Sequence, residues 1–328
     1  MTAAQATPSA SPPTATPAGT TRRPRKRKRQ LWRDLPAWGF LTPVAVLFVL
    51  FMVAPIGYAL FLSFRTYKTQ GLGLGKGARK EVWNGLENYA KALSDPEFLA
   101  SVGRVLIYGL VLVPTMILLA TIFALLLDSR RARLKQFSRV SIFLPYAVPA
   151  VISSLMWGFL YLPAVSPFHW LAGRAGVSLP NMVSPNLITF AVANIALWGG
   201  VGFNMVVIYT SLKAIPSELY EAAVLDGCTE FQIAVRVKVP IVAPAIIMTL
   251  LFSLISTLQV FAEPMTLKPL TNTVPSTWTP LMKIYRDAFV RDDIFSAAAS
   301  SIVVAFVTFL VSFGFLRLVQ GRAFNEDQ

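Results

Sequence analysis

The chain has 328 residues, of which 55% are hydrophobic and only 14% are charged. A water-soluble protein of this size needs more charged surface, so the composition indicates a chain that lies largely in lipid. A single histidine, His169, and a single cysteine, Cys228, exclude an internal disulfide and a Cys/His metal site.

The N-terminal segment, residues 1–35, differs in composition from the rest of the chain. Residues 1–21 are mainly Ala, Thr, Pro and Ser without an aliphatic run, which predicts disorder. Much of the net charge of +14 follows between Arg22 and Arg33. A basic cluster directly before an apolar run is typical of an orientation signal and an anionic-lipid contact. We therefore expect a cytoplasmic tail and no nucleic acid partner.

Six apolar segments follow that are long enough to cross a bilayer. About 20 largely apolar residues in a helix span the roughly 30 Å of hydrocarbon. The segments are residues 37–64, 102–127, 141–161, 187–212, 241–261 and 295–318. Prolines inside them, such as Pro55 and Pro149, are tolerated because neighbouring helices satisfy the freed carbonyls. The sequence predicts an all-α integral membrane protein with six transmembrane helices in one domain, residues 36–320.

The placement of Lys and Arg predicts the orientation. Dense basic clusters lie before the first span and at residues 130–139. Because such clusters stay inside, both termini should be cytoplasmic, including a short tail at 321–328. The segments 65–101 and 262–294 would then lie outside. They are either solvated connectors with aromatic interface anchors or a landing surface for an external partner.

The sequence offers no nucleotide site of its own. Gly75 and Lys76 lie in a Gly-rich stretch, but a phosphate-binding loop needs a glycine where Gln70 stands and Ser or Thr where Gly77 stands. We therefore expect any ATP to be bound elsewhere than on this chain.

The loop between the fourth and fifth spans, residues 213–240, carries helix signals. Pro216 and Ser217 can start a short helix, and Gly227 can end it in the left-handed conformation. A second short helix should begin near Thr229 and stop before Pro240. The pattern predicts a helix–turn–helix on the cytoplasmic side.

This loop resembles the EAA loop of binding-protein-dependent ABC importer permeases. It contains Glu-Ala-Ala at 221–223, Asp-Gly at 226–227 and then Pro240, after Leu-Lys-Ala-Ile-Pro-Ser-Glu-Leu-Tyr at 212–220. Trp-Gly-Phe-Leu-Thr-Pro-Val at 38–44 and Trp-Asn-Gly-Leu-Glu-Asn-Tyr at 83–89 are similar to the maltose/glycerol-phosphate/trehalose permease family. The resemblance covers residues 36–320.

The resemblance implies a type I ABC importer permease fold in the bacterial cytoplasmic (inner) membrane. The implied function is a non-catalytic permease subunit of a sugar importer, for a disaccharide or oligosaccharide. Its implied partners are a second homologous permease, a dimeric ABC ATPase that binds ATP and Mg²⁺, and an extracytoplasmic substrate-binding protein. The ATPase-coupling residues would be Glu221, Ala222, Ala223, Asp226 and Gly227. Cys228 stands where the family usually has Ala.

Polar side chains within spans are costly in lipid and usually face the interior. The candidates for the substrate pathway are Asn194, Trp198, Asn204, Gln259 and Glu263. Amide, carboxylate and aromatic groups suit a sugar, although the same groups could form interhelical hydrogen bonds instead. The three glycines at 199, 200 and 202 should permit close helix packing or flexing rather than contact substrate.

Two other interpretations stay open. One is a permease of the same superfamily for another solute, namely glycerol-phosphate, an amino acid or a peptide. The other is a membrane-embedded enzyme, which would need a polar catalytic cluster. Asp292 and Asp293, at the edge of the last span, form an acidic pair that could contribute to one.

Overall fold

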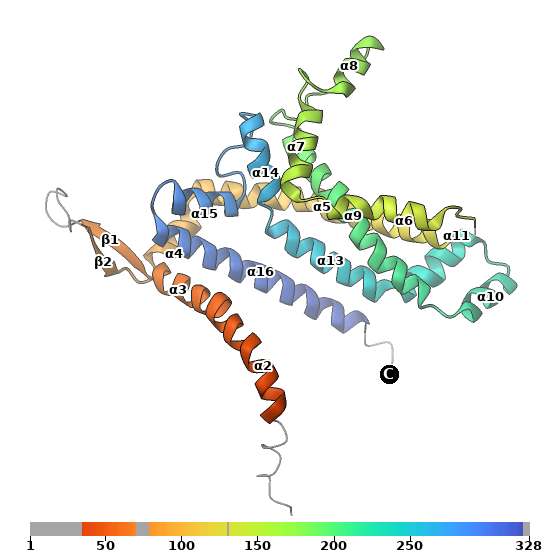
Figure 1. The fold of residues 1–328 in the computed structure, drawn as a ribbon, viewed down its shortest axis with the longest axis horizontal. Helices are drawn as coiled ribbons and strands as arrows, with labels where there is room; N and C mark the ends of the chain where they lie inside the picture. Colours follow the sequence, from red (N-terminus) through yellow and green to blue (C-terminus); the bar gives the residue numbers. More distant parts are fainter. Residues whose placement is uncertain (1–34, 70–78, 130, 324–328) are drawn as a thin grey trace, which may run out of the picture. The chain divides into compact units, whose positions relative to one another are not determined.

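The computed structural model describes residues 35–69, 79–129 and 131–323 (Figure 1). The tail up to residue 34, the glycines between 71 and 77, Arg130 and residues 324–328 lie outside the described residues. The chain forms two compact units, Met1–Pro55 and Ile56–Gln328. The segment predicted as one domain therefore contributes to both.

The first predicted span is helical. It consists of α2 (Leu35–Phe48), a π-helical turn (Val49–Val53) and α3 (Ala54–Ser63). Within it, Gly39–Ser63 has 25 residues and a mean hydropathy of 2.5, which suffices to cross a bilayer.

Two π-helical turns accommodate prolines inside helices. Pro55 lies two residues after the turn Val49–Val53, and Pro240 lies two residues after the turn Ala234–Lys238. Proline lacks an N–H, and its ring clashes with the carbonyl four residues earlier in a regular helix, which a wider turn relieves. The helix expected to stop before Pro240 therefore continues through it to Ile241, and that prediction is wrong.

Three further helices are long enough to span without a break. They are α5 (Pro96–Asp128), α9 (Ile188–Lys213) and α16 (Ile294–Ala323). α5 begins six residues before the predicted span because Asp95 caps it, accepting a hydrogen bond from the Glu97 backbone N–H at 2.8 Å. α16 continues three residues beyond the predicted end of the domain at 320.

The third and fifth predicted spans are bent. The third consists of α6 (Lys135–Phe143), the 3₁₀ helix η3 (Leu144–Ala147) and α7 (Ala150–Tyr161), with a bend of 98°. The span predicted at 141–161 is not one continuous helix, because Pro145 and Pro149 interrupt the hydrogen-bond ladder.

In the fifth, the stretch Glu230–Ile241 meets α13 (Ala243–Leu258) at 69°. Among the described residues, four helices can span a membrane as they stand, or up to six if each bent pair counts as one span.

The two connecting segments contain regular structure. Segment 65–101 forms an antiparallel hairpin, β1 (Arg65–Thr69) with β2 (Arg79–Trp83), and α4 (Glu87–Ser94). These strands were not predicted. Segment 262–294 forms α14 (Ala262–Leu267), η5 (Lys268–Leu270) and α15 (Pro280–Phe289). A short helix, α8 (Pro167–Arg174), follows α7.

The main core of the second unit lies between α5 and α9. Ala120 and Ala124 of α5 and Ala191 of α9 are fully buried, and such small residues let two helix backbones approach closely. The last residues of the two helices, Asp128 and Lys213, form an ion pair at 2.7 Å, so the helices run in the same direction.

Gly202 of α9 allows a second close approach. A Cβ at this position would overlap the carbonyl oxygen of Ile142 and lie 2.7 Å from the Cα of Phe143, whereas a Cβ at Gly199 would meet nothing within 4 Å. α6 can therefore pack on α9 only if residue 202 has no side chain. This agrees with the packing role predicted for the glycines.

We expect Gly202→Ala to lower the apparent Tm of the purified protein in detergent. The added methyl group meets backbone that cannot move aside, and such overpacking costs about 1–3 kcal/mol. Gly199→Ala is the matched control because it adds the same methyl group to the same helix in open space. An equal Tm for the two variants would contradict this account of the α6–α9 contact.

Candidate functional site

A cavity of about 590 Å³ lies among the helices of the second unit. Its walls come from α5, η3, α7, α9, α13 and the first turn of α14. The bend between α6 and α7 contributes directly, since η3 and the start of α7 form one wall, while the middle of α13 forms another.

Two polar groups in the cavity wall have no hydrogen-bond partner among the described residues. Asn204 donates its Nδ2 to the carbonyl of Gly200 at 3.1 Å, which leaves Oδ1 unpaired. The hydroxyl of Ser253 is also unpaired. Both residues are more than nine-tenths buried. Because buried polar groups are nearly always hydrogen-bonded, these atoms indicate a place for a ligand or water.

Further hydroxyl and aromatic groups surround these atoms. Ser153 and Ser256 line the cavity beside them. Tyr146 and Phe203 stack with ring centroids 5.0 Å apart, and both rings border the cavity. The wall therefore offers hydrogen-bonding groups together with an aromatic surface.

Among the described residues that line the cavity, Glu263 in the first turn of α14 is the only ionisable acid or base apart from Tyr146. Within the described part of the chain, no Lys or Arg does so. The cavity thus has hydroxyl and amide groups, one carboxyl group and no fixed positive charge.

The structure brings together two of the five predicted pathway residues, Asn204 and Glu263. Asn194 and Trp198 lie in an adjoining aromatic cluster and do not line the cavity. Asn194 donates to the Tyr161 hydroxyl at 2.7 Å, which is an interhelical bond between α9 and α7. Trp198 packs edge-on against Trp157 at 6.1 Å.

The fifth predicted residue, Gln259, is exposed at the C-terminal end of α13, away from the cavity wall. Substrate contact by any of the five stays a prediction. Gly199 and Gly200, expected only to pack, line the cavity. The sequence reasoning missed Ser253 and Ser256, although hydroxyl residues three apart in an apolar helix lie on one face and could have indicated them.

The loop 213–240 contains the helix–turn–helix predicted for it. α10 (Ser217–Leu225) follows Pro216, and Gly227 has a φ of +79° in the turn. Thr229 then caps α11 (Glu230–Ile233) through a capping box with Gln232. In Figure 1, α10 and α11 lie beyond the end of α9.

The predicted coupling residues lie in the second half of α10 and in the turn that follows it. Glu221, Ala222, Asp226 and Gly227 are exposed, whereas Ala223 is buried. The first four are available to a partner, and Ala223 packs within the loop.

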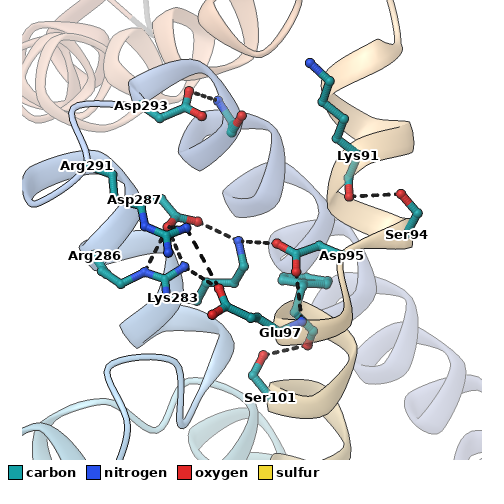
Figure 2. Close-up of polar contacts among 12 residues, drawn as sticks. Lys91, Ser94, Asp95, Glu97, Ser101, Lys283, Arg286, Asp287, Arg291 and Asp293 are labelled. Carbon is teal, nitrogen blue, oxygen red and sulfur yellow. Dashed lines mark hydrogen bonds and ion pairs between the residues drawn. The ribbon is translucent and has the colours of Figure 1, made fainter.

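An ionic cluster joins the two connecting segments (Figure 2). Lys283 of α15 lies between Asp95, at 2.8 Å, and Asp287, at 2.5 Å. Arg286 contacts Glu97 at 2.6 Å and Asp287 at 2.8 Å. The cluster fixes α15 to the start of α5, so segments 65–101 and 262–294 form one surface rather than two independent connectors.

Burial and pairing act in opposite directions on these charges. Burial alone would raise the pKa of Asp95, but Lys283 and the backbone N–H of Glu97 lower it below its ordinary 3.8. Burial alone would lower the pKa of Lys283, but the carboxylates of Asp287 and Asp95 raise it above its ordinary 10.5. Both partners are therefore charged at neutral pH.

The acidic pair Asp292 and Asp293 has a structural role. Asp293 Oδ1 accepts a hydrogen bond from the backbone N–H of Ser296 at 3.1 Å, which caps the start of α16. Asp292 has a positive φ of 57° in the turn before that helix. This arrangement favours a helix cap over a catalytic pair.

The apolar spans, the cavity between them with its few polar groups and the exposed helix–turn–helix at one end define a multi-pass membrane permease. The family described as binding-protein-dependent transport system inner membrane component matches residues 116–324, and the chain belongs to this family. It is a permease subunit of an ABC importer, as the sequence predicted.

The similarity extends over most of the chain. The sn-glycerol-3-phosphate transport system permease protein UgpA of Brucella abortus biovar 1 (strain 9-941) is 29% identical over 289 residues, which cover 86% of this chain and 94% of the relative. A solved bacterial ABC transporter involved in the import of the acidic polysaccharide alginate matches with a TM-score of 0.77 and 18% identity, covering 90% of this chain and 98% of that chain.

A second structure, the bacterial alginate ABC transporter in complex with alginate pentasaccharide-bound periplasmic protein, matches with a TM-score of 0.76 at 18% identity. It covers 91% of this chain and 98% of that chain. These likenesses confirm the predicted permease fold.

Asp95→Asn should lower the apparent Tm at pH 7, by the equivalent of about 1 kcal/mol, because it removes one charge beside buried Lys283. Asparagine caps a helix as well as aspartate, so α5 should keep its start. A lowered pKa means that the stabilisation is present above pH about 4 and is lost as the pH falls through the folded-state pKa.

The variant should therefore lose less stability than the wild type between pH 7 and pH 3, as thermal melts across this range would measure. Glu81→Gln, which breaks the exposed pair with Arg65 at 2.8 Å, is the control and should change the Tm little. Parallel pH profiles for Asp95→Asn and the wild type would contradict the assignment.

Proposed function

We propose that the chain forms half of the translocation pathway of an ATP-driven importer for neutral disaccharides or oligosaccharides. The observation that carries this proposal is the chemistry of the cavity wall. Unpaired Asn204 Oδ1 and Ser253 Oγ, the Tyr146–Phe203 stack and the absence of Lys or Arg among the described lining residues suit hydroxyl-rich, uncharged molecules. A volume of about 590 Å³ is in the range of small-molecule sites.

An anionic substrate fits this cavity less well. The relatives named above are described for sn-glycerol-3-phosphate and for an acidic polysaccharide. Sites for phosphate or carboxylate groups normally supply Arg or Lys side chains. Among the described residues that line this cavity, no such side chain is present.

The proposed assembly contains a second homologous permease, a dimeric ABC ATPase that binds ATP and Mg²⁺, and an extracytoplasmic substrate-binding protein. This chain would hydrolyse no ATP itself. We further propose that both termini are cytoplasmic, which places the loop 213–240 on the side where ATP is available. The basic residues Arg131, Arg133, Lys135 and Arg139, on the same side as this loop, support that orientation.

The same loop would dock the ATPase. Exposed Glu221 and Asp226 offer carboxylates to a basic groove, and Ala222 allows close approach. Gly227 lets the chain turn between α10 and α11 with a φ that an L side chain rarely adopts.

Uptake measurements test the substrate. Cells that express the complete transporter should take up labelled neutral disaccharides, such as maltose or trehalose, and should show no uptake of sn-glycerol 3-phosphate above a deletion strain. Glu263→Lys should reduce neutral sugar uptake by about tenfold, because it places a desolvated charge in the cavity wall. Uptake of glycerol 3-phosphate alone by the unmodified transporter would overturn the neutral-sugar assignment.

Glu221→Lys should abolish substrate-stimulated ATP hydrolysis by the assembled complex while the subunit still inserts into the membrane. The change reverses a charge on the surface proposed to meet the ATPase, and like charges at an interface cost several kcal/mol. ATPase assays on complexes in proteoliposomes measure this effect. Glu87→Lys, an equally exposed charge reversal on α4, should retain full stimulation, and full stimulation in both variants would refute the docking role.

A further inference from the structure

One carboxylate ties together both ends of the loop 213–240. Asp128, the last residue of α5, places Oδ1 2.7 Å from Lys213 Nζ and Oδ2 2.6 Å from Lys238 Nζ. Lys213 is the last residue of α9, and Lys238 ends the π-helical turn that leads through Pro240 towards α13. The two lysines thus mark where the chain leaves the helix bundle and where it returns.

The contact also reaches the docking helix. The ammonium group of Lys238 lies 4.8 Å from the centre of the Tyr220 ring, an arrangement in which a cation attracts the aromatic face. Tyr220 is the neighbour of Glu221 in α10. A continuous series of contacts therefore joins the proposed ATPase surface to the end of α5.

The position of Asp128 is unfavourable on its own. A negative charge at the C-terminal end of a helix opposes the helix dipole, and the Asp128 side chain is only 10% exposed. Two lysines compensate for this cost, and one of them, Lys238, is itself only 16% exposed. The three charges hold one another in place.

Two helices that meet at Asp128, α5 and α9, are also walls of the cavity, and the segment that carries Lys238 leads through a bend of 69° into a third wall, α13. α5 contributes Met116, α9 contributes Asn204 and α13 contributes Ser253. Because the cluster fixes the ends of α5 and α9 to the segment that leads into α13, displacement of α10 is transmitted to these helices rather than bending the loop alone.

We propose that Asp128 is the positioning residue that converts movement of the loop 213–240 into movement of α5, α9 and α13 around the cavity. The inference rests on the proposed docking of an ATPase at Glu221. Neutralising Asp128 should therefore leave ATP hydrolysis in place but separate it from the change in access to the cavity.

The experiment follows the accessibility of a cavity residue in the complete transporter. Ser256→Cys, in a Cys228→Ala background, provides a single thiol in the cavity wall. The rate of labelling by a small charged maleimide is measured without nucleotide and after trapping with ATP and vanadate. With Asp128 intact we expect the two labelling rates to differ by about fivefold or more. In Asp128→Asn the two rates should differ by less than about twofold, although this variant should still hydrolyse ATP. Asp128→Glu should restore part of the difference.

The neutral triple variant Asp128→Asn/Lys213→Met/Lys238→Met guards against misfolding, because it leaves no buried charge unpaired. It should bind the ATPase and hydrolyse ATP, yet show the same small labelling difference. A difference in labelling rate as large as in the Asp128-intact transporter would overturn the proposal. Loss of ATPase binding, ATP hydrolysis and the labelling difference together would also overturn it, because that result would indicate a purely structural cluster. Failure of the Asp128-intact complex to retain the ATPase would instead overturn the proposed function.

Discussion

The packing of α5 against α9 is the contact on which the second unit depends. Fully buried alanines on both helices let the backbones approach closely, and without a hydrophobic force between helices in lipid such close contact is the main source of association. The other functional features are arranged along this pair. The cavity lies beside its middle, the Asp128 cluster joins its ends, and the ionic cluster around Lys283 holds α15 against the start of α5.

Proline has two different effects in this chain. The helix continues through Pro114 of α5 without a π-helical turn, and after such a turn it continues through Pro55 and, as far as Ile241, through Pro240. Where two prolines fall four residues apart, at Pro145 and Pro149, the helix breaks and turns by 98°. The break matters for function because it brings η3 and the start of α7 to the cavity, where a straight span would have presented only its flank.

Features set by local chemistry could be predicted from the sequence, and features set by distant contacts could not. The unbroken spans and the short helices of the loop 213–240 follow from hydropathy and from Pro216, Gly227 and Thr229. The ionic cluster joins Asp95 to Lys283 across the chain, and nothing near either residue in sequence indicates the other. Asn194 and Asn204 illustrate the same limit, since both are amides in α9 and only the second lines the cavity.

The two kinds of polar residue in the helices are distinguished by whether the protein satisfies them. Arg104 of α5 donates to the carbonyls of Thr277 and Trp278 at 2.6 and 3.0 Å, and Asn194 donates to Tyr161, so these side chains stabilise contacts between elements. Asn204 Oδ1 and Ser253 Oγ are buried with no protein partner among the described residues, at a cost of about 1–3 kcal/mol each when nothing binds them. A permease must bind its substrate weakly enough to release it. Two polar atoms that the fold leaves unpaired, one on α9 and one on α13, suit that need, because in the proposed function a ligand would satisfy them only while it occupies the cavity.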